Sequence, residues 1–314
     1  MAKRNRKAYP PVCEALPIPV IDNHTHLPVG NAPGAFGDER DYSHRPSEEI
    51  PPSIDEHLAR METCGIRGAI TCGCELPEIP GHIELARAYS QKLWAAIAIH
   101  PNEAPLHQCI TEKSPDGMEH GLDEHHRQYT LDDALAVVAD HARDSSVVAI
   151  GETGLDYYRT GDAGKEAQKE SFRAHIALAK ELDLPLQIHD RDAHADVVDV
   201  LKAEGAPQRT VFHCFSGDVQ LAHVCAEQGW FASFSGTLTY KGNDDLRAAF
   251  LVLPDELILL ETDAPYLTPQ EFRGQPNAPY VAAYTARAMS DIRHVSLDTW
   301  CETLSANTHV VYGL

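Results

Sequence analysis

Six residues of types that commonly bind metal ions are spread over most of this 314-residue chain. Each lies in or directly after a short run of apolar and β-branched residues, so each is expected at the end of a buried strand. They are His24, His26, Glu152, His189, His213 and Asp263. Imidazole nitrogens and carboxylate oxygens are the ligands that zinc and related divalent metals prefer. The sequence therefore predicts a metal centre, provided that the fold brings these residues together.

The clearest short motif is His24-Thr25-His26. Residues two apart in a strand point the same way, so both imidazoles can reach one ion. A single pair of this kind is a weak signal, because core or surface histidines also produce it. All six residues together favour a metal centre over six separate structural roles.

The elements that must position these residues are short strands alternating with amphipathic helices. Strands are predicted at Ile18–Leu27, Gly68–Cys74, Leu93–His100, Val147–Asp156, Leu184–Asp190, Thr210–Phe215, Trp230–Gly236 and Leu257–Leu267. Helices are predicted at Ser53–Cys64, Ile83–Lys92, Thr130–Arg143, Lys165–Leu182, Ala193–Lys202, Val219–Gln228 and Asp244–Val252, and after Pro279 and Ser296. Eight strand–helix units predict an α/β fold, a (β/α)8 TIM barrel forming one domain over 1–314. All strand ends of such a barrel open onto one face.

Two stretches interrupt the alternation and are predicted to be long loops on that face, near 28–52 and 102–129. The second carries His107, His120, His125 and His126 among acidic residues. We expect these histidines to be solvated rather than metal-bound, because surface loops usually are.

Charge and composition limit the classes of partner. The chain has 26 Lys and Arg against 47 Asp and Glu, a net charge of −21. This disfavours broad adhesion to nucleic acid or to anionic membranes, so a polyanionic substrate would need metal ions and a few placed cations. The sequence has no apolar run of the roughly 18 residues that span a bilayer and no secretory signal, so the cytoplasm is the expected location. Eight dispersed cysteines indicate reduced thiols, with Cys72 and Cys74 as small buried residues.

Several longer motifs resemble, in order, the TatD family of metal-dependent deoxyribonucleases in the amidohydrolase superfamily. They are HTH, AIHPNEA, AIGETGLDYY, LPLQIHDRDA, FHCFSGD, SFSG, LLETDAPYLTP and the RG-x-x-N segment at Arg273–Asn277. The match runs from about Val20 to Asn307. The resemblance implies a TIM barrel, a divalent-metal centre and hydrolysis of phosphodiester bonds in DNA, typically as a 3′-to-5′ exonuclease. With so negative a chain, we expect action on single-stranded or frayed ends.

Residue by residue, the resemblance places one metal on His24, His26, Glu152 and Asp263. Glu152 would bridge to a second metal on His189 and His213. Two ions about 4 Å apart can lower the pKa of a bridging water and offset charge on a phosphate. Asp263 and Glu152 are thus the predicted catalytic residues, with Asp263 also accepting the proton of the water. Four imidazoles suit Zn, Mn or Fe better than Mg, although Mg or Mn is expected to support activity.

Two residues are predicted to contact the substrate. His100 matches a family histidine at the pocket rim that could touch the phosphate. Arg191 is expected at the start of the helix after the fifth strand, where it would bind phosphate, or else pair with Asp190 or Asp192. Positive potential near the mouth could also come from Lys241, Arg159 and Arg273. We expect Asp22 to orient an imidazole.

The chain departs from the family pattern where Asn277 is followed by Ala278 and Pro279 in place of a carboxylate and proline. Two alternatives therefore stay open. One is an amidohydrolase-type enzyme that acts on a small ester, amide or phosphoester. The other is a non-catalytic metal-binding barrel, which the presence of both Glu152 and Asp263 disfavours. The residues are compatible with DNA or RNA and with exonuclease or endonuclease action, and they indicate no obligate protein partner.

Overall fold

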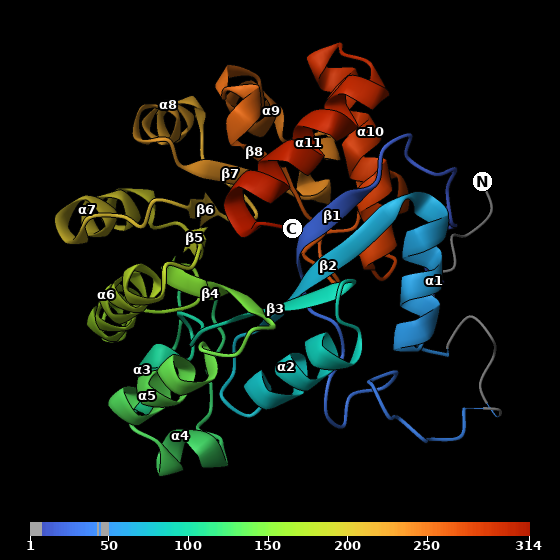
Figure 1. Ribbon diagram of the computed structural model, residues 1–314. Helices are drawn as coiled ribbons and strands as arrows, with labels where there is room; N and C mark the ends of the chain where they lie inside the picture. Colours follow the sequence, from blue (N-terminus) through green and yellow to red (C-terminus); the bar gives the residue numbers. More distant parts are fainter. Residues whose placement is uncertain (1–7, 43, 45–49) are drawn as a thin grey trace.

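The computed structural model describes residues 8–42, 44 and 50–314 of the protein. At its centre, eight parallel strands follow one another in chain order around a nearly closed barrel, with helices between them (Figure 1). The strands are β1 (Val20–Thr25), β2 (Ile66–Gly73), β3 (Leu93–Ile97), β4 (Val147–Asp156), β5 (Leu186–Arg191), β6 (Thr210–Phe212), β7 (Phe231–Phe234) and β8 (Ile258–Leu260). The predicted TIM barrel is confirmed.

The helices surround the barrel in Figure 1. They are α1 (Ile54–Cys64), α2 (Ile79–Ala88), α3 (Ala104–His107), α4 (Glu124–Gln128), α5 (Leu131–His141), α6 (Lys165–Leu182), α7 (His194–Glu204), α8 (Val219–Gln228), α9 (Asp244–Val252), α10 (Ala282–Arg293) and α11 (Leu297–Tyr312). Short 3-10 turns occur at η2 (Gly236–Thr239), η3 (Asp255–Leu257), η4 (Gln270–Phe272) and η5 (Pro279–Val281). The predicted bounds of α6, α8 and α9 are correct, and Ser53 caps α1 through the predicted capping box with Glu56.

The apolar residues of the strands serve two separate layers. On β2 and β3, Ala69, Leu93, Ala95 and Ile97 belong to the large core shared with the surrounding helices. The alternate positions Ile70, Cys72 and Ala96 join a smaller cluster that also contains Val311 and Tyr312 from the end of α11. Successive side chains of a strand point to opposite faces, which explains the division. The end of the last helix therefore packs against side chains of the barrel interior.

The barrel closes between its first and last strands with little regular ladder. One isolated parallel bridge joins Thr25 to Ala264, beyond the end of β8. Lower on the seam, the Asn23 side chain donates to the carbonyl of Leu260 over 2.9 Å. A buried backbone acceptor costs free energy if left unpaired, so this amide replaces a missing ladder bond. Side chains therefore supplement the few backbone bonds of this seam.

Several strands are shorter than predicted, and β8 is reduced to three residues. Of the rest of the predicted Leu257–Leu267 strand, Leu257 ends η3, and residues 261–267 follow β8 without forming a regular strand. The segment 102–129, predicted as a loop, contains α3 and α4, whose few residues gave no helical periodicity. Of the predicted loop at 28–52, residues 43 and 45–49 lie outside the described residues; the others form neither helix nor strand.

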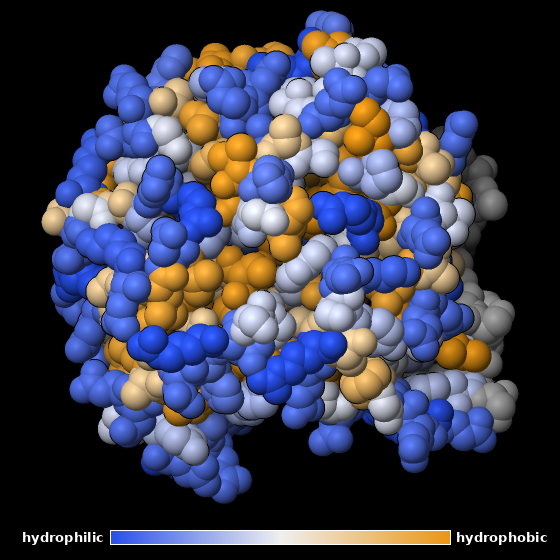
Figure 2. Space-filling view, in the orientation of Figure 1, coloured by the Kyte–Doolittle hydropathy of each residue, from blue (hydrophilic) through white to orange (hydrophobic). Residues whose placement is uncertain are grey.

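Hydrophilic side chains cover most of the periphery of the face seen in Figure 2, and apolar side chains gather nearer its middle. Among the described residues, no helix combines the length and the apolar character needed to cross a bilayer.

A buried histidine on α6 connects the helical layer to the strands. The Nε2 atom of His175 accepts the backbone N–H of Ile99 over 3.2 Å, and its Nδ1–H donates to the carbonyl of Ser171 over 2.8 Å. Both ring nitrogens are therefore used by a neutral imidazole. Burial lowers the pKa of His175 to about 4, although the bond to Ser171 opposes the shift.

This pKa predicts a loss of stability in acid. A histidine whose pKa is lower in the folded than in the unfolded state contributes fully to the stability of the folded state above about pH 6.5. That contribution is lost as the pH falls toward 4. A shift from 6.5 to about 4 corresponds to about 3 kcal/mol. Between pH 7 and pH 4.5, the free energy of unfolding measured with urea should fall less for His175→Gln than for the parent protein. An equal fall in both would contradict the prediction, and the exposed His223→Gln serves as the control.

Candidate metal centre

The carboxylate of Glu152, on β4, is the meeting point of four predicted ligands. Its Oε2 atom lies 3.3 Å from Nε2 of His24 and 3.6 Å from Nε2 of His26. Its Oε1 atom lies 2.6 Å from Nδ1 of His189 and 3.0 Å from Nε2 of His213. One buried carboxylate thus faces imidazoles from β1, β5 and the segment after β6.

Asp263 completes the group from the turn that follows β8. Its Oδ1 atom lies 3.4 Å from Nε2 of His26 and 3.9 Å from Nε2 of His24. The backbone N–H of Asp263 donates to the carbonyl of His24 over 2.9 Å, which holds this turn against β1. His100, after β3, also joins the site, because its Nε2 atom lies 3.2 Å from Oε1 of Glu152. The structure therefore brings all six predicted ligands and His100 to one place.

The placement follows from the topology of the barrel. Glu152 lies in the carboxyl half of β4, and the other residues lie within three positions of the carboxyl end of a strand. In a parallel barrel those ends share one face. Residues separated by more than 200 positions can meet there without any local motif connecting them. The strand-end pattern seen in the sequence is what made the convergence predictable.

The rings of His24 and His26 are held from behind by oxygen acceptors. Nδ1 of His24 lies 2.9 Å from Oε1 of Gln187, and Nδ1 of His26 lies 3.2 Å from the carbonyl of Cys72. Since these oxygens accept, each Nδ1 carries a proton, so the neutral form of either ring has its lone pair on the Nε2 atom that faces the centre. Metal-binding histidines are commonly held in this way.

Gln187 is fixed in turn by its own amide. Its Nε2 atom donates to the carbonyl of Asn23 over 2.9 Å and to the hydroxyl of Tyr312 over 2.8 Å. The end of α11 is thereby connected through Gln187 to the ring of His24. The packing of the last helix and the orientation of a candidate ligand are thus linked.

The expectation that Asp22 orients an imidazole is wrong. Its carboxylate accepts from the backbone N–H of Thr262 over 2.8 Å and from the hydroxyl of Thr262 over 2.6 Å. Its remaining contact in this region is with the backbone N–H of His24, at 3.4 Å. Asp22 therefore secures the seam between β1 and the segment after β8, and Gln187 orients the ring.

The electrostatics of the site are those of ionised carboxylates compensated by imidazoles. Burial opposes ionisation of Glu152, but His213, His100 and His189 hold its pKa well below the usual range. Burial likewise opposes protonation of His213, yet Glu152 and Glu261 raise its pKa well above the usual range. Burial also opposes protonation of His189, but Asp156 and Glu152 raise its pKa to about 9.

This charge balance fits a metal centre. A cluster of buried carboxylates requires compensating positive charge, which protons on the rings supply in the absence of an ion. Divalent cations bound among the same nitrogen and oxygen atoms would supply it instead. The donor chemistry of the residues present therefore suits a metal, with more nitrogen ligands than Mg²⁺ prefers.

Four residues of this region were not foreseen as parts of the site. Oδ2 of Asp156 lies 3.0 Å from Nε2 of His189, Oε1 of Glu261 lies 3.4 Å from Nδ1 of His213, and Sγ of Cys74 lies 3.6 Å from Oε2 of Glu152. Gln187 is the fourth. Gln187 and Glu261 each precede a predicted ligand by two positions, so the alternation of side chains along a strand could have identified them.

Arg191 differs from its predicted position. It is the last residue of β5 rather than part of the next helix, and its guanidinium carbon lies 4.0 Å from the centre of the Tyr158 ring. Among the ion pairs of the described residues, Asp190 pairs with His194 at 2.7 Å. Arg191 is therefore held by an aromatic ring at the same strand end as His189.

Comparison with known proteins agrees with these features. A family model described as TatD related DNase matches residues 21–313. The chain is 34% identical over 299 residues to the uncharacterized metal-dependent hydrolase TatD of Mycobacterium tuberculosis, covering 94% of this chain and 98% of that protein. It is 32% identical to the uncharacterized metal-dependent hydrolase YabD of Bacillus subtilis, covering 87% and 98%. The crystal structure of YJJV, a TatD homolog from Escherichia coli, superposes with a TM-score of 0.74 at 28% identity, covering 94% and 98%.

The central place of Glu152 predicts that its replacement weakens metal binding. Glu152→Gln removes the charge that faces four imidazoles, so bound Mn²⁺ or Zn²⁺ should fall, with affinity reduced at least about tenfold. Metal content by mass spectrometry after desalting measures this. Glu302→Gln, at an exposed position of α11, is the matched control. Unchanged metal content in Glu152→Gln would contradict a metal centre at this carboxylate.

Proposed function

Because the chain belongs to the TatD family of metal-dependent hydrolases, we propose that it hydrolyses phosphodiester bonds in DNA as a 3′-to-5′ exonuclease on single-stranded or frayed ends. The observation that carries this proposal is the convergence of four imidazoles with Glu152 and Asp263 at the carboxyl ends of the strands. Nitrogen and carboxylate donors arranged in this way suit metal-assisted hydrolysis.

We assign the donor atoms to two sets that share Glu152. One ion would be held by His24, His26, Glu152 and Asp263, and a second ion by Glu152, His189 and His213. Bound divalent ions would lower the pKa of a water molecule and offset the charge of the phosphate. Oε1 and Oε2 of Glu152 face different imidazoles, as a shared carboxylate requires.

Asp263 is the residue best placed to accept a proton during hydrolysis. Burial opposes its ionisation, but His26, His213 and His24 lower its pKa, so it is a carboxylate at neutral pH. Its Oδ1 atom lies 3.4 Å from Nε2 of His26, which fixes the carboxylate beside the reacting region. A positioned carboxylate of this kind can act as a general base toward water.

The surroundings of the centre favour an unpaired strand end as the substrate. His100 follows β3 and Arg191 ends β5, on the two sides of β4, and we assign both to contacts with the substrate phosphate. The exposed ring of Tyr266 lies 6.2 Å from the ring of His26, and the exposed ring of Tyr158 lies under Arg191. Aromatic rings stack on unpaired bases regardless of sequence. A chain of net charge −21 would rely on such local contacts.

The decisive experiment compares substrates. Protein stripped by chelation and reconstituted with Mn²⁺ or Mg²⁺ is given end-labelled single-stranded DNA, the same sequence as RNA, and bis(p-nitrophenyl) phosphate. We expect metal-dependent shortening of the DNA from its 3′ end, with kcat about 10²- to 10⁴-fold lower in Asp263→Asn. Asp291→Asn, at an exposed position, is the control. Turnover of bis(p-nitrophenyl) phosphate with intact DNA would instead support the alternative hydrolase, which acts on a small phosphoester.

A second prediction concerns phosphate binding. Arg191→Ala removes a guanidinium that can bond a phosphate but removes no metal ligand, so KM for single-stranded DNA should rise about tenfold or more at unchanged metal content. Arg173→Ala, on the outer side of α6, provides the matched loss of one charge. Kinetics of Arg191→Ala equal to those of the Arg173 variant would assign Arg191 a structural role.

A further inference from the structure

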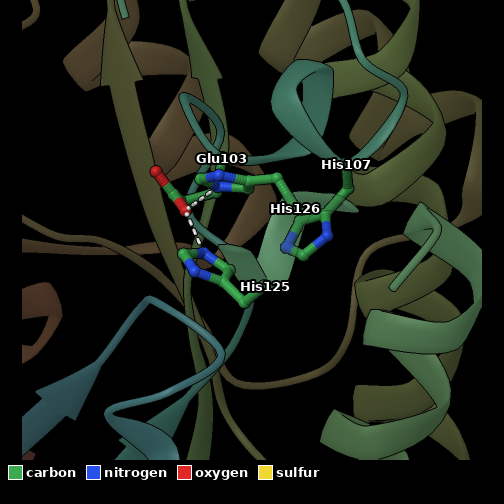
Figure 3. Close-up of side chains that lie close together, drawn as sticks. All are labelled: Glu103, His107, His125 and His126. Atoms are coloured by element: carbon green, nitrogen blue, oxygen red, sulfur yellow. Dashed lines mark hydrogen bonds and ion pairs between the residues drawn. The ribbon is translucent and has the colours of Figure 1, made fainter. Parts of the chain in front are cut away.

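Away from Glu152, the segment 102–129 forms a second cluster of potential ligands (Figure 3). Glu103 immediately precedes α3, His107 ends it, and His125 and His126 lie on α4. One ligand atom from each of the four residues lies within 4.8 Å of every other. His107 and His126 are each only 3% exposed, so the expectation of solvated histidines is wrong for these two.

His107 presents an unused nitrogen to this cluster. Its Nδ1–H donates to the carbonyl of Tyr129 over 2.9 Å, which leaves a lone pair on Nε2. That Nε2 atom is buried and has no hydrogen-bond partner among the described residues. A buried polar atom without a partner costs free energy. A histidine whose other ring nitrogen donates to a backbone carbonyl is held as metal-binding histidines are.

His126 has a different role, because its tautomer is set by the backbone. Its Nδ1 atom accepts the N–H of Asp123 over 2.9 Å, so the proton of the neutral ring is on Nε2. That Nε2 lies 2.7 Å from Oε2 of Glu103 and donates to it. His126 therefore orients the carboxylate of Glu103 and has no free nitrogen for an ion.

His125 supplies the remaining donor. Its Nε2 atom lies 3.3 Å from the same Oε2 atom of Glu103. The side chains of His125 and Glu103 are 13% and 14% exposed, so solvent can reach the cluster from their side. His107, in contrast, approaches from the buried side.

We propose that Glu103, His107 and His125 bind a divalent transition metal of the zinc class, with His126 as the hydrogen-bond partner of Glu103. Two imidazole nitrogens and one carboxylate oxygen match the ligands of Zn²⁺, and the exposed side leaves a fourth position for water. This ion is additional to any bound around Glu152.

The position of the cluster indicates a structural purpose. Glu103 follows His100 by three residues, and its backbone N–H donates to the carbonyl of His100 over 2.9 Å. An ion on Glu103, His107 and His125 would join α3 and α4 to the segment that carries His100. It would thereby fasten the segment 102–129 beside the mouth of the barrel.

The test uses full-length protein carrying Glu152→Gln, so that ions at the barrel centre contribute little. Zn²⁺ is titrated into chelator-stripped protein, and retained zinc and thermal stability are measured. We expect about one zinc per chain and a zinc-dependent rise in Tm. In this background, adding His107→Ala or His125→Ala should weaken zinc binding by about 10- to 100-fold or more, since loss of a partner that only supports a ligand already has an effect of that size.

Added His223→Ala, which removes an exposed histidine of α8, should leave zinc binding unchanged. His125 is partly exposed, so its variant decides the matter if His107→Ala fails to fold. Zinc binding and Tm rise in His125→Ala equal to those of the parent would overturn the proposal. Equal loss in the His223 variant would identify the zinc as adventitious.

Discussion

The buried carboxylate of Glu152 is the interaction on which the rest of this structure depends. A charged group buried away from solvent requires a compensating charge nearby. Imidazoles near the ends of three other strands and in the segment after β3 provide it for Glu152. Their common orientation requires each strand to end at the right height around the barrel. Any shift of one strand by a residue would turn its ligand to the opposite face. The electrostatic requirement of one side chain thus constrains the register of the sheet.

The closure of the barrel is subject to the same constraint. The first and last strands are joined chiefly by the side chains of Asp22 and Asn23, and the backbone of Asp263 bonds that of His24. These bonds place Asp263 beside His24 and His26. The seam and the part of the candidate site that contains Asp263 are therefore one structure, so weakening the closure would also displace a candidate ligand.

The segment after β3 extends this organisation beyond the barrel. The backbone N–H of Asn102 donates to Nδ1 of His100 over 3.0 Å, and its side chain donates to Asp156 over 3.2 Å. Asp156 in turn faces His189. Glu103, the next residue, begins the second histidine cluster. The insertion is thereby connected to the site through adjacent residues, which gives a physical reason for a long and otherwise polar segment to be ordered there.

Local patterns along the chain predict the order of the strands, the eight-unit barrel and the set of candidate ligands at the strand ends. Apolar periodicity and a polar residue at the end of a run are local, so neighbouring residues suffice to reveal them. Tertiary structure alone decided that Gln187 rather than Asp22 holds the ring of His24, that Arg191 lies on Tyr158, and that histidines of the segment 102–129 meet on Glu103. These contacts join residues whose pairing depends on side-chain direction after the chain has folded. Strands can be predicted because their apolar pattern involves residues close in sequence. The hydrogen-bond partners of a side chain are distant in sequence and come together only when the chain folds.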